Sequence, residues 1–149
     1  MLILMRHGEA GWDAPSDSER VLTESGVVYI GEQMARYEKN LARVDKVVCS
    51  SYFRARQTAA LLLKACKPGA DLVIDDRWSP EASVNDAMLA LEEHWVENLL
   101  VVTHQPLIGY AVPFLIEGDI RSPEPLLPGQ LVVLDILWPG RASAIRLPL

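Results

Sequence analysis

The residues best suited to chemistry lie near the start of the chain, where the apolar run from Met1 to Met5 stops at Arg6-His7-Gly8. A guanidinium fork can hold the oxygens of a phosphoryl group, and an imidazole nitrogen can attack phosphorus. Gly8 permits a sharp turn directly after the histidine. The pattern predicts that Arg6 and His7 belong to a phosphoryl-transfer site, although the tripeptide alone would arise by chance in roughly one chain of this length in a hundred.

Two further residues with the same chemistry follow apolar runs later in the chain. Arg54 comes after the run from Val44 to Cys49, and His104 comes after the run from Leu99 to Val102. Each has an ordinary explanation when taken alone: a solvated arginine at the start of a helix, or a hydrogen-bonded core histidine. Because open α/β sheets bind ligands at the carboxyl ends of their strands, the three positions together predict one shared phosphate site.

The segments that must position these side chains alternate between the patterns of strands and helices. Strands are predicted at residues 1–5, 44–49, 72–74 and 99–102. A first helix is predicted after the N-cap Thr23, with apolar positions at Val27, Ile30, Met34, Tyr37 and Leu41. Further helices are predicted at Ala55 to Cys66 and at Val84 to Trp95, and a last one has Pro106 in its first turn. Such alternation is typical of parallel βαβ units with helices on both faces of one sheet.

The last part of the chain departs from this alternation. Residues 117–129 form a proline-rich loop, and the segments Gln130 to Trp138 and Arg141 to Leu147 flank a Pro139-Gly140 turn. They predict a hairpin that adds an antiparallel strand to the sheet. The expected fold is therefore α/β: a single domain over residues 1–149, with a mostly parallel sheet between two layers of helices.

Composition narrows the classes of function. The chain has 149 residues, half of them hydrophobic, and a formal net charge of −6, which argues against nonspecific nucleic-acid binding. No apolar stretch has membrane-spanning length, and no signal-peptide pattern is visible. A cytoplasmic location is expected, with no nucleic-acid or membrane partner.

Three other residues that often carry chemistry are assigned none. Cys49 and Cys66 lack metal-ligand spacing and fall in apolar patterns, so buried thiols are expected. His94 stands late in a helix, where the helix dipole favours a positive charge. No metal and no cofactor are predicted.

Four segments in the same order resemble the histidine phosphatase superfamily, and most closely its small SixA-like phosphohistidine phosphatases. They are Arg6-His7-Gly8-Glu9-Ala10, residues 16–23, residues 50–59, and Thr103-His104-Gln105-Pro106-Leu107-Ile108-Gly109. The resemblance is weakest after about Gly118. Val21 and Ser51 stand where the family usually has proline, and neither change removes a chemical group.

The resemblance implies a phosphoglycerate mutase-like fold and a role for each site residue. His7 would be the nucleophile, Arg6, Arg54 and His104 would line the phosphate pocket, and Arg20 would lie near the pocket mouth. A protonated His104 is expected to add a third positive donor, and Gly8 is expected to bind the substrate together with Arg20. For Arg20, pairing with Asp17 in the loop is an equally good explanation.

The substrate expected from the resemblance is a phosphohistidine on another protein, such as a histidine phosphotransfer domain or a phosphotransferase-system carrier. A short chain leaves little length for a lid over a small substrate. Two alternatives remain open: a phosphatase of small phosphate esters or sugar phosphates, and a non-catalytic phosphate-binding module. The general acid is also open, since Glu81, Glu9 or no residue could protonate the leaving group.

Overall fold

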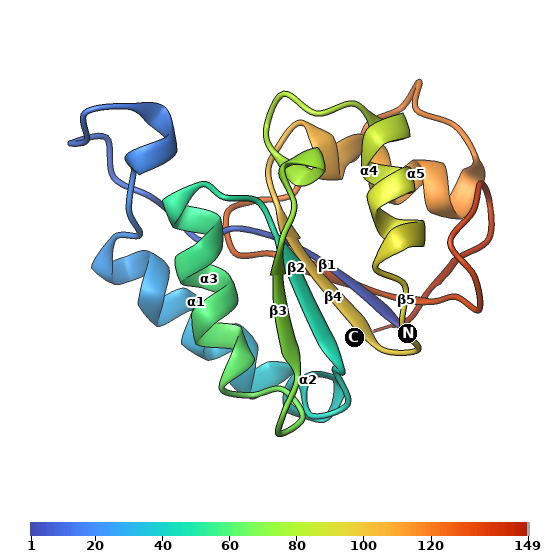
Figure 1. Ribbon diagram of the computed structural model, residues 1–149, viewed down its shortest axis with the longest axis horizontal. Helices are drawn as coiled ribbons and strands as arrows, with labels where there is room; N and C mark the ends of the chain where they lie inside the picture. Colours follow the sequence, from blue (N-terminus) through green and yellow to red (C-terminus); the bar gives the residue numbers. More distant parts are fainter. Residues whose placement is uncertain (149) are drawn as a thin grey trace.

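The computed structural model describes residues 1–148 and contains one six-stranded sheet with helices on both faces (Figure 1). The strands are β1 (Leu2–Arg6), β2 (Lys46–Cys49), β3 (Asp71–Ile74), β4 (Leu99–Thr103), β5 (Leu131–Asp135) and β6 (Ile145–Arg146). The helices are α1 (Glu24–Arg36), α2 (Glu38–Leu41), α3 (Phe53–Leu63), α4 (Val84–Glu93) and α5 (Leu107–Glu117), with 3-10 turns η1 (Asp17–Glu19) and η2 (Asp76–Trp78).

The order of strands in the sheet decides where the site forms. The order is β3-β2-β4-β1-β5-β6, so β2, β4 and β1 are direct neighbours. These three strands and β3 are parallel, whereas β5 runs antiparallel to β1, and β6 runs antiparallel to β5. The carboxyl ends of β1, β2 and β4 therefore meet at one edge of the sheet, as the sequence predicts for the three segments that precede the site residues.

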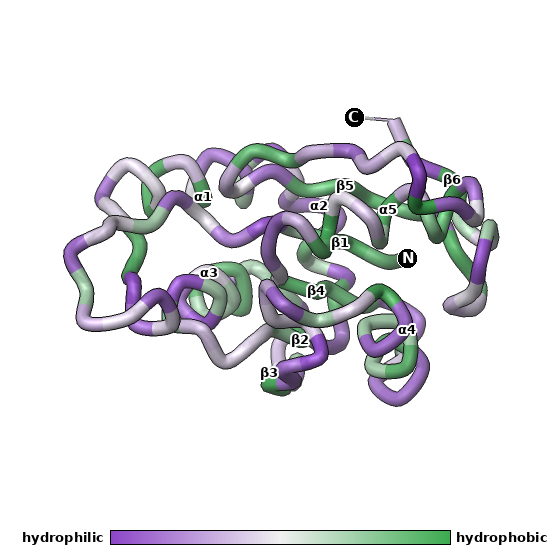
Figure 2. Tube along the Cα trace, turned by 90° about the horizontal axis from the view of Figure 1, so that it is seen from above, coloured by the Kyte–Doolittle hydropathy of each residue, from purple (hydrophilic) through white to green (hydrophobic). Residues whose placement is uncertain are grey.

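Alternating side chains of the sheet supply two separate cores. Leu2 and Leu4 of β1 pack with α4 and α5, while Ile3 and Met5 pack on the other face with α1 and α3. Figure 1 shows these two helical layers on opposite sides of the sheet, and Figure 2 shows the apolar strands enclosed between more polar segments. A strand buried on both faces is expected to be apolar throughout.

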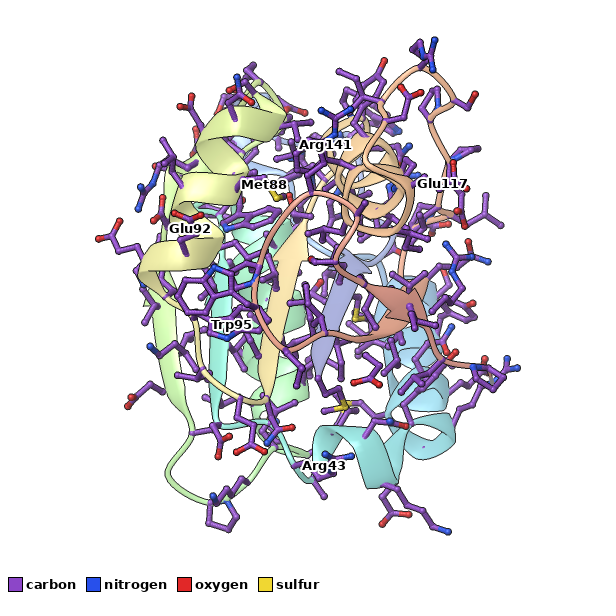
Figure 3. All side chains as sticks on the ribbon, turned by 90° about the vertical axis from the view of Figure 1, so that its right-hand side faces the viewer. Arg43, Met88, Glu92, Trp95, Glu117 and Arg141 are labelled. Atoms are coloured by element: carbon purple, nitrogen blue, oxygen red, sulfur yellow. The ribbon has the colours of Figure 1, made fainter. Side chains whose placement is uncertain are left out.

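Helix α4 illustrates how an amphipathic pattern fixes one layer. Met88 and Trp95 are partly buried against the core that contains α5, while Glu92 is exposed (Figure 3). Ser83 caps the helix, because its hydroxyl accepts from the backbone N–H of Asp86 at 3.1 Å. The predicted helix between Val84 and Trp95 is confirmed, ending at Glu93.

Three details differ from the predictions. Val27 is 42% exposed and does not join the buried stripe of α1; that helix ends at Arg36, and Leu41 lies in the separate helix α2. Pro106 precedes the first residue of α5 instead of lying in its first turn. The hairpin forms, but its second strand is the two-residue β6. No helix within residues 1–148 has both the length and the apolar character to cross a bilayer.

Candidate active site

Three neighbouring strands deliver the candidate residues to one place. The sheet register pairs Arg6 of β1 with Thr103 of β4, so His7 and His104 leave the sheet at the same level. Their rings lie 4.9 Å apart between centroids. The chain leaving β2 enters α3, whose second residue is Arg54. The structure thus brings together the histidines and arginines that the sequence placed in one site.

The hydrogen bonds of His7 define which ring nitrogen carries a proton. Nδ1 lies 2.7 Å from the carbonyl oxygen of Gly8, and a carbonyl can only accept, so Nδ1 is the donor. In the neutral ring Nε2 then carries a lone pair and no proton. The Nε–H group of Arg54 donates to this nitrogen at 3.2 Å. His7 therefore presents an unprotonated Nε2, as a nucleophile requires.

Gly8 serves the site through its backbone. Its carbonyl orients His7, and its N–H donates to the Thr58 hydroxyl at 3.1 Å. That hydroxyl donates in turn to the carbonyl of Arg54 at 2.7 Å. A Cβ atom at Gly8 would lie 2.6 Å from Cδ1 of Ile30. Both polar groups of Gly8 are thus engaged, and its contribution is to orient the His7 ring.

Two buried nitrogens at the site have no hydrogen-bond partner within residues 1–148. One is Nε of Arg6 and the other is Nδ1 of His104. Another nitrogen of each side chain is engaged: Nη1 of Arg6 donates to the carbonyl of Leu126 at 2.7 Å, and Nε2 of His104 lies 2.5 Å from the Ser50 hydroxyl. Buried polar groups are nearly always satisfied, and an exception commonly marks a bound ion or a functional site. Both nitrogens can donate to a phosphoryl oxygen.

Burial and positive neighbours keep both imidazoles neutral. Burial lowers the pKa of His7 to about 4. The hydrogen bond to Gly8 opposes this shift in part, whereas the charges of Arg54, Arg6 and Arg20 reinforce it. For His104, burial and then His7 and the guanidiniums lower the pKa to about 2. His104 is therefore neutral in the structure, because it is buried and because the charges around it are positive. The protonated His104 expected from the sequence requires that the ring gain its proton together with the phosphoryl group.

We expect an NMR pH titration to give a midpoint near pH 4 for His7. A ring with this lowered pKa stays neutral from pH 8 down to pH 5 and charges only below. The urea-unfolded protein serves as the control and should titrate near 6.5. A midpoint at or above 6.5 in the folded protein would mean that His7 is not held in a buried, positively charged setting.

The same pKa shifts predict that acid weakens the fold. Below pH 6.5 the unfolded chain binds protons at His7 and His104 that the folded chain does not. The free energy of unfolding should therefore decrease as the pH falls from 6.5 toward 4. Urea denaturation of wild type and of His7→Ala at pH 7 and pH 4.5 measures this difference. If His7→Ala loses as much free energy of unfolding between the two pH values as wild type, the contribution of His7 is contradicted.

Arg20 lies in the loop that precedes α1, and its hydrogen bonds are made within that loop. Nε donates to the carbonyl of Gly11 at 2.9 Å, Nη2 to that of Ala10 at 3.2 Å, and Nη1 to the Asp17 carboxylate at 3.1 Å. Its guanidinium stacks on Trp12 at 3.5 Å. The pairing with Asp17 that the sequence left open is present, while the charge of Arg20 still acts on His7.

The two candidate acids lie in different surroundings. The Glu9 carboxylate accepts from Thr23 and Ser25 at 2.8 and 2.9 Å, which lowers the pKa of Glu9. A carboxylate held ionised in this way is a poor proton donor. Glu81 instead accepts from the Tyr52 hydroxyl at 3.1 Å. Tyr52 meets the ring of His104 edge-on, at 5.0 Å between centroids, so Glu81 is linked to the site and Glu9 to the start of α1.

Several contributing residues were not singled out from the sequence. Ser50 and Thr58 are fully buried polar residues in the segment that contains Arg54. Thr58 stands four residues after Arg54, on the same helical face, and that spacing was the available signal. Tyr52 and Asp17 reach the site from turns, where side-chain direction has no periodicity to reveal it.

His94 lies outside the site, at the end of α4. Its Nε2 is 2.9 Å from the Asp75 carboxylate, and Glu93 completes a group whose potential metal-ligating atoms lie within 4.8 Å of one another. Arg77 donates to both carboxylates, and this ion-pair network accounts for the group without a metal. Cys49 and Cys66 are buried as predicted, and burial raises the pKa of each thiol to about 11.

Comparison with known proteins identifies the family. The model of the histidine phosphatase superfamily (branch 1) matches residues 2–87. Phosphohistidine phosphatase SixA of Escherichia coli (strain K12) is 31% identical over 131 residues, which cover 79% of this chain and 75% of that protein.

Solved structures confirm the fold class. The protein histidine phosphatase SixA complexed with tungstate has a TM-score of 0.82 at 24% identity, and the match covers 97% of this chain and 92% of that one. Phosphoglycerate mutase from Plasmodium falciparum has a TM-score of 0.69 at 19% identity, over 99% and 88% of the two chains. The phosphoglycerate mutase-like fold implied by the sequence motifs is thus confirmed, and the chain belongs to the SixA-like part of the histidine phosphatase superfamily.

Proposed function

We propose that this protein is a phosphohistidine phosphatase that acts on a histidine-phosphorylated protein through a phosphorylated His7. The observation that carries the proposal is the unprotonated Nε2 of His7, 3.2 Å from Arg54 Nε and beside the His104 ring. The similarity to SixA of Escherichia coli supports the substrate class. The tungstate bound in a SixA structure supports an oxyanion pocket, because tungstate is tetrahedral like phosphate.

In the first step, Nε2 of His7 attacks phosphorus and a new N–P bond forms. The P–N bond of the substrate breaks, and its electron pair leaves with the substrate imidazole, which takes a proton from solvent or from a side chain. Arg6 and Arg54 hold the phosphoryl oxygens in the transition state. Phosphoryl transfer relies chiefly on positioning and charge stabilisation of this kind.

In the second step, water attacks the phosphorus of phosphorylated His7. The N–P bond breaks, its electron pair returns to Nε2, and the oxygen of the water becomes part of inorganic phosphate. Both protons of the water leave with the phosphate, which passes one of them to solvent at neutral pH. The bond from Nδ1 to the Gly8 carbonyl, 2.7 Å long, keeps the ring in one orientation through both steps. One tautomer thus serves attack and release.

His104 completes the proposed pocket. Its low pKa results from burial and from positive neighbours, and a phosphoryl dianion beside the ring opposes the second cause. Substrate binding therefore favours uptake of a proton by His104, which then adds a positive donor. A preorganised donor of this kind contributes on the order of 10²-fold to a rate in a site that excludes water.

The proposed partner is a protein whose phosphohistidine projects from its surface, such as a histidine phosphotransfer domain or a phosphotransferase-system carrier. The hollows of about 470 Å³ between α1 and β5 and about 510 Å³ between α3 and β3 are not lined by His7, Arg54 or His104. A side chain presented by another protein needs no deep cavity. We further propose that residues 1–149 act as one domain, in the cytoplasm.

A phosphatase of small phosphate esters is the second candidate, favoured by the link from Glu81 through Tyr52 to His104. An alkoxide leaving group needs a proton, whereas the conjugate acid of imidazole has a pKa near 6.5 and leaves with little help. We expect Glu81→Gln to retain most of the wild-type rate on a phosphohistidine protein.

Rates on a phosphohistidine protein and on a panel of phosphate esters test this expectation. Glu9→Gln is the matched control, since its carboxylate binds Thr23 and Ser25 instead of Tyr52. A wild type that prefers small esters, with a loss of about 10²-fold in Glu81→Gln, would overturn the proposed substrate class in favour of the ester phosphatase.

A further inference from the structure

Asp17 engages the whole outer edge of the Arg54 guanidinium. Nη1 of Arg54 donates to the Asp17 carbonyl at 2.6 Å, and Nη2 donates to its carboxylate at 3.2 Å. The third nitrogen, Nε, points to His7 Nε2 at 3.2 Å. Because a guanidinium is planar and rigid, two bonds at one edge fix the direction of the N–H bond at the other.

Asp17 is itself held in place by the loop. The second oxygen of its carboxylate accepts from Arg20 at 3.1 Å, and Arg20 is bound to the carbonyls of Ala10 and Gly11. The Asp17 side chain is 55% exposed, whereas that of Arg54 is 5% exposed. The Asp17 carboxylate therefore stays in contact with water while it binds two nitrogen-bearing side chains, and its effect on the buried guanidinium is to fix its orientation.

We propose that Asp17 is a positioning residue for phosphoryl transfer, which acts through Arg54 by holding its Nε–H group beside His7 Nε2, where this N–H passes from the nitrogen to an oxygen of the incoming phosphoryl group. The inference rests on the proposed function and deepens it, because it assigns to the loop before α1 a part in catalysis. This role also gives a function to the bonds of Arg20 within the loop. Arg20 orients the Asp17 carboxylate, and this carboxylate in turn orients the Arg54 guanidinium.

This role predicts opposite effects on turnover and on anion binding. In Asp17→Asn the guanidinium keeps its bond to the backbone carbonyl of residue 17 but loses its charged side-chain partner. The Nε–H direction is then held less firmly, so kcat should fall by about 10-fold to 100-fold. The same change removes a negative charge next to the pocket, so tungstate affinity should be kept or increased. A merely structural defect would weaken both.

The experiment compares wild type, Asp17→Asn and Asp13→Asn, which neutralises another exposed acid of the same loop. The measurements are kcat and KM on a phosphohistidine protein, tungstate affinity by calorimetry, and the side-chain Nε–H NMR signal of Arg54. We expect Asp17→Asn alone to lower kcat and to lose the exchange-protected Arg54 signal, with tungstate binding kept.

An unchanged kcat or an unchanged Arg54 signal in Asp17→Asn would overturn the inference, and so would a parallel loss of turnover, tungstate binding and melting temperature. The failure of the proposed function looks different: wild type itself would then not turn over phosphohistidine protein. In that case the Arg54 signal and the tungstate comparison, which need no turnover, still decide whether Asp17 positions Arg54.

Discussion

Replacing His7 with alanine is expected to lower the rate on a phosphohistidine protein by on the order of 10⁴-fold or more, because the nucleophile of a two-step transfer cannot be bypassed. His7 is buried, and its Nε2 faces the guanidinium that would hold the phosphoryl group. Steady-state release of inorganic phosphate measures the loss. The pocket should keep measurable tungstate affinity, since Arg6, Arg54 and His104 remain.

The control for this variant is the replacement of the third histidine, His94→Ala. His94 pairs with Asp75 away from the site, so its loss should leave the rate close to that of wild type. Circular dichroism checks that both variants are folded. A His7→Ala protein with a tenth or more of the wild-type rate would show that the imidazole of His7 does not carry the reaction.

The second large effect is expected for Arg54→Ala, with a loss of about 10²-fold to 10³-fold in kcat/KM. The variant removes the N–H group that points to His7 Nε2 and one of the charges that keep His7 neutral. Tungstate affinity should fall with it, in contrast to Asp17→Asn. Arg54→Lys should recover little, since an ammonium cannot bind Asp17 and the phosphoryl group with one rigid fork.

Arg56 offers a matched control on the same helix. It lies two residues farther along α3 and is exposed, whereas Arg54 is buried. Arg56→Ala removes an equal charge at a similar place in the fold, and its kcat/KM should stay within about twofold of wild type because exposed charges are screened by salt. Equal losses in the two variants would mean that Arg54 acts through general electrostatics instead of contact.

The sequence was sufficient for the site residues that follow strands. The apolar runs that end at Met5, Cys49 and Val102 form buried strands. A polar residue follows each run directly. Parallel strands carry their carboxyl ends to one edge, so position along the chain was enough to predict proximity. The motifs then supplied the role of each residue.

The contacts made through loops and charges required the structure. Asp17 reaches Arg54 across 37 residues of sequence from a turn that has no periodic pattern. The neutral state of His104 depends on its burial and on the positive groups that surround it after folding, which composition does not show. Val27 lies on the apolar spacing of α1, yet its side chain is exposed after folding.

The proposed mechanism requires a covalent phosphoryl group on Nε2 of His7, which rapid-quench trapping at neutral or alkaline pH can detect. Mixing enzyme with labelled phosphohistidine protein and mapping the label by mass spectrometry should place it on His7, with ³¹P NMR reporting the Nε2-linked isomer. An enzyme that turns over substrate rapidly with no label on His7, or with the label on His104, would contradict the account. If the enzyme carries no label after mixing and releases no phosphate, the protein is instead a phosphate-binding module.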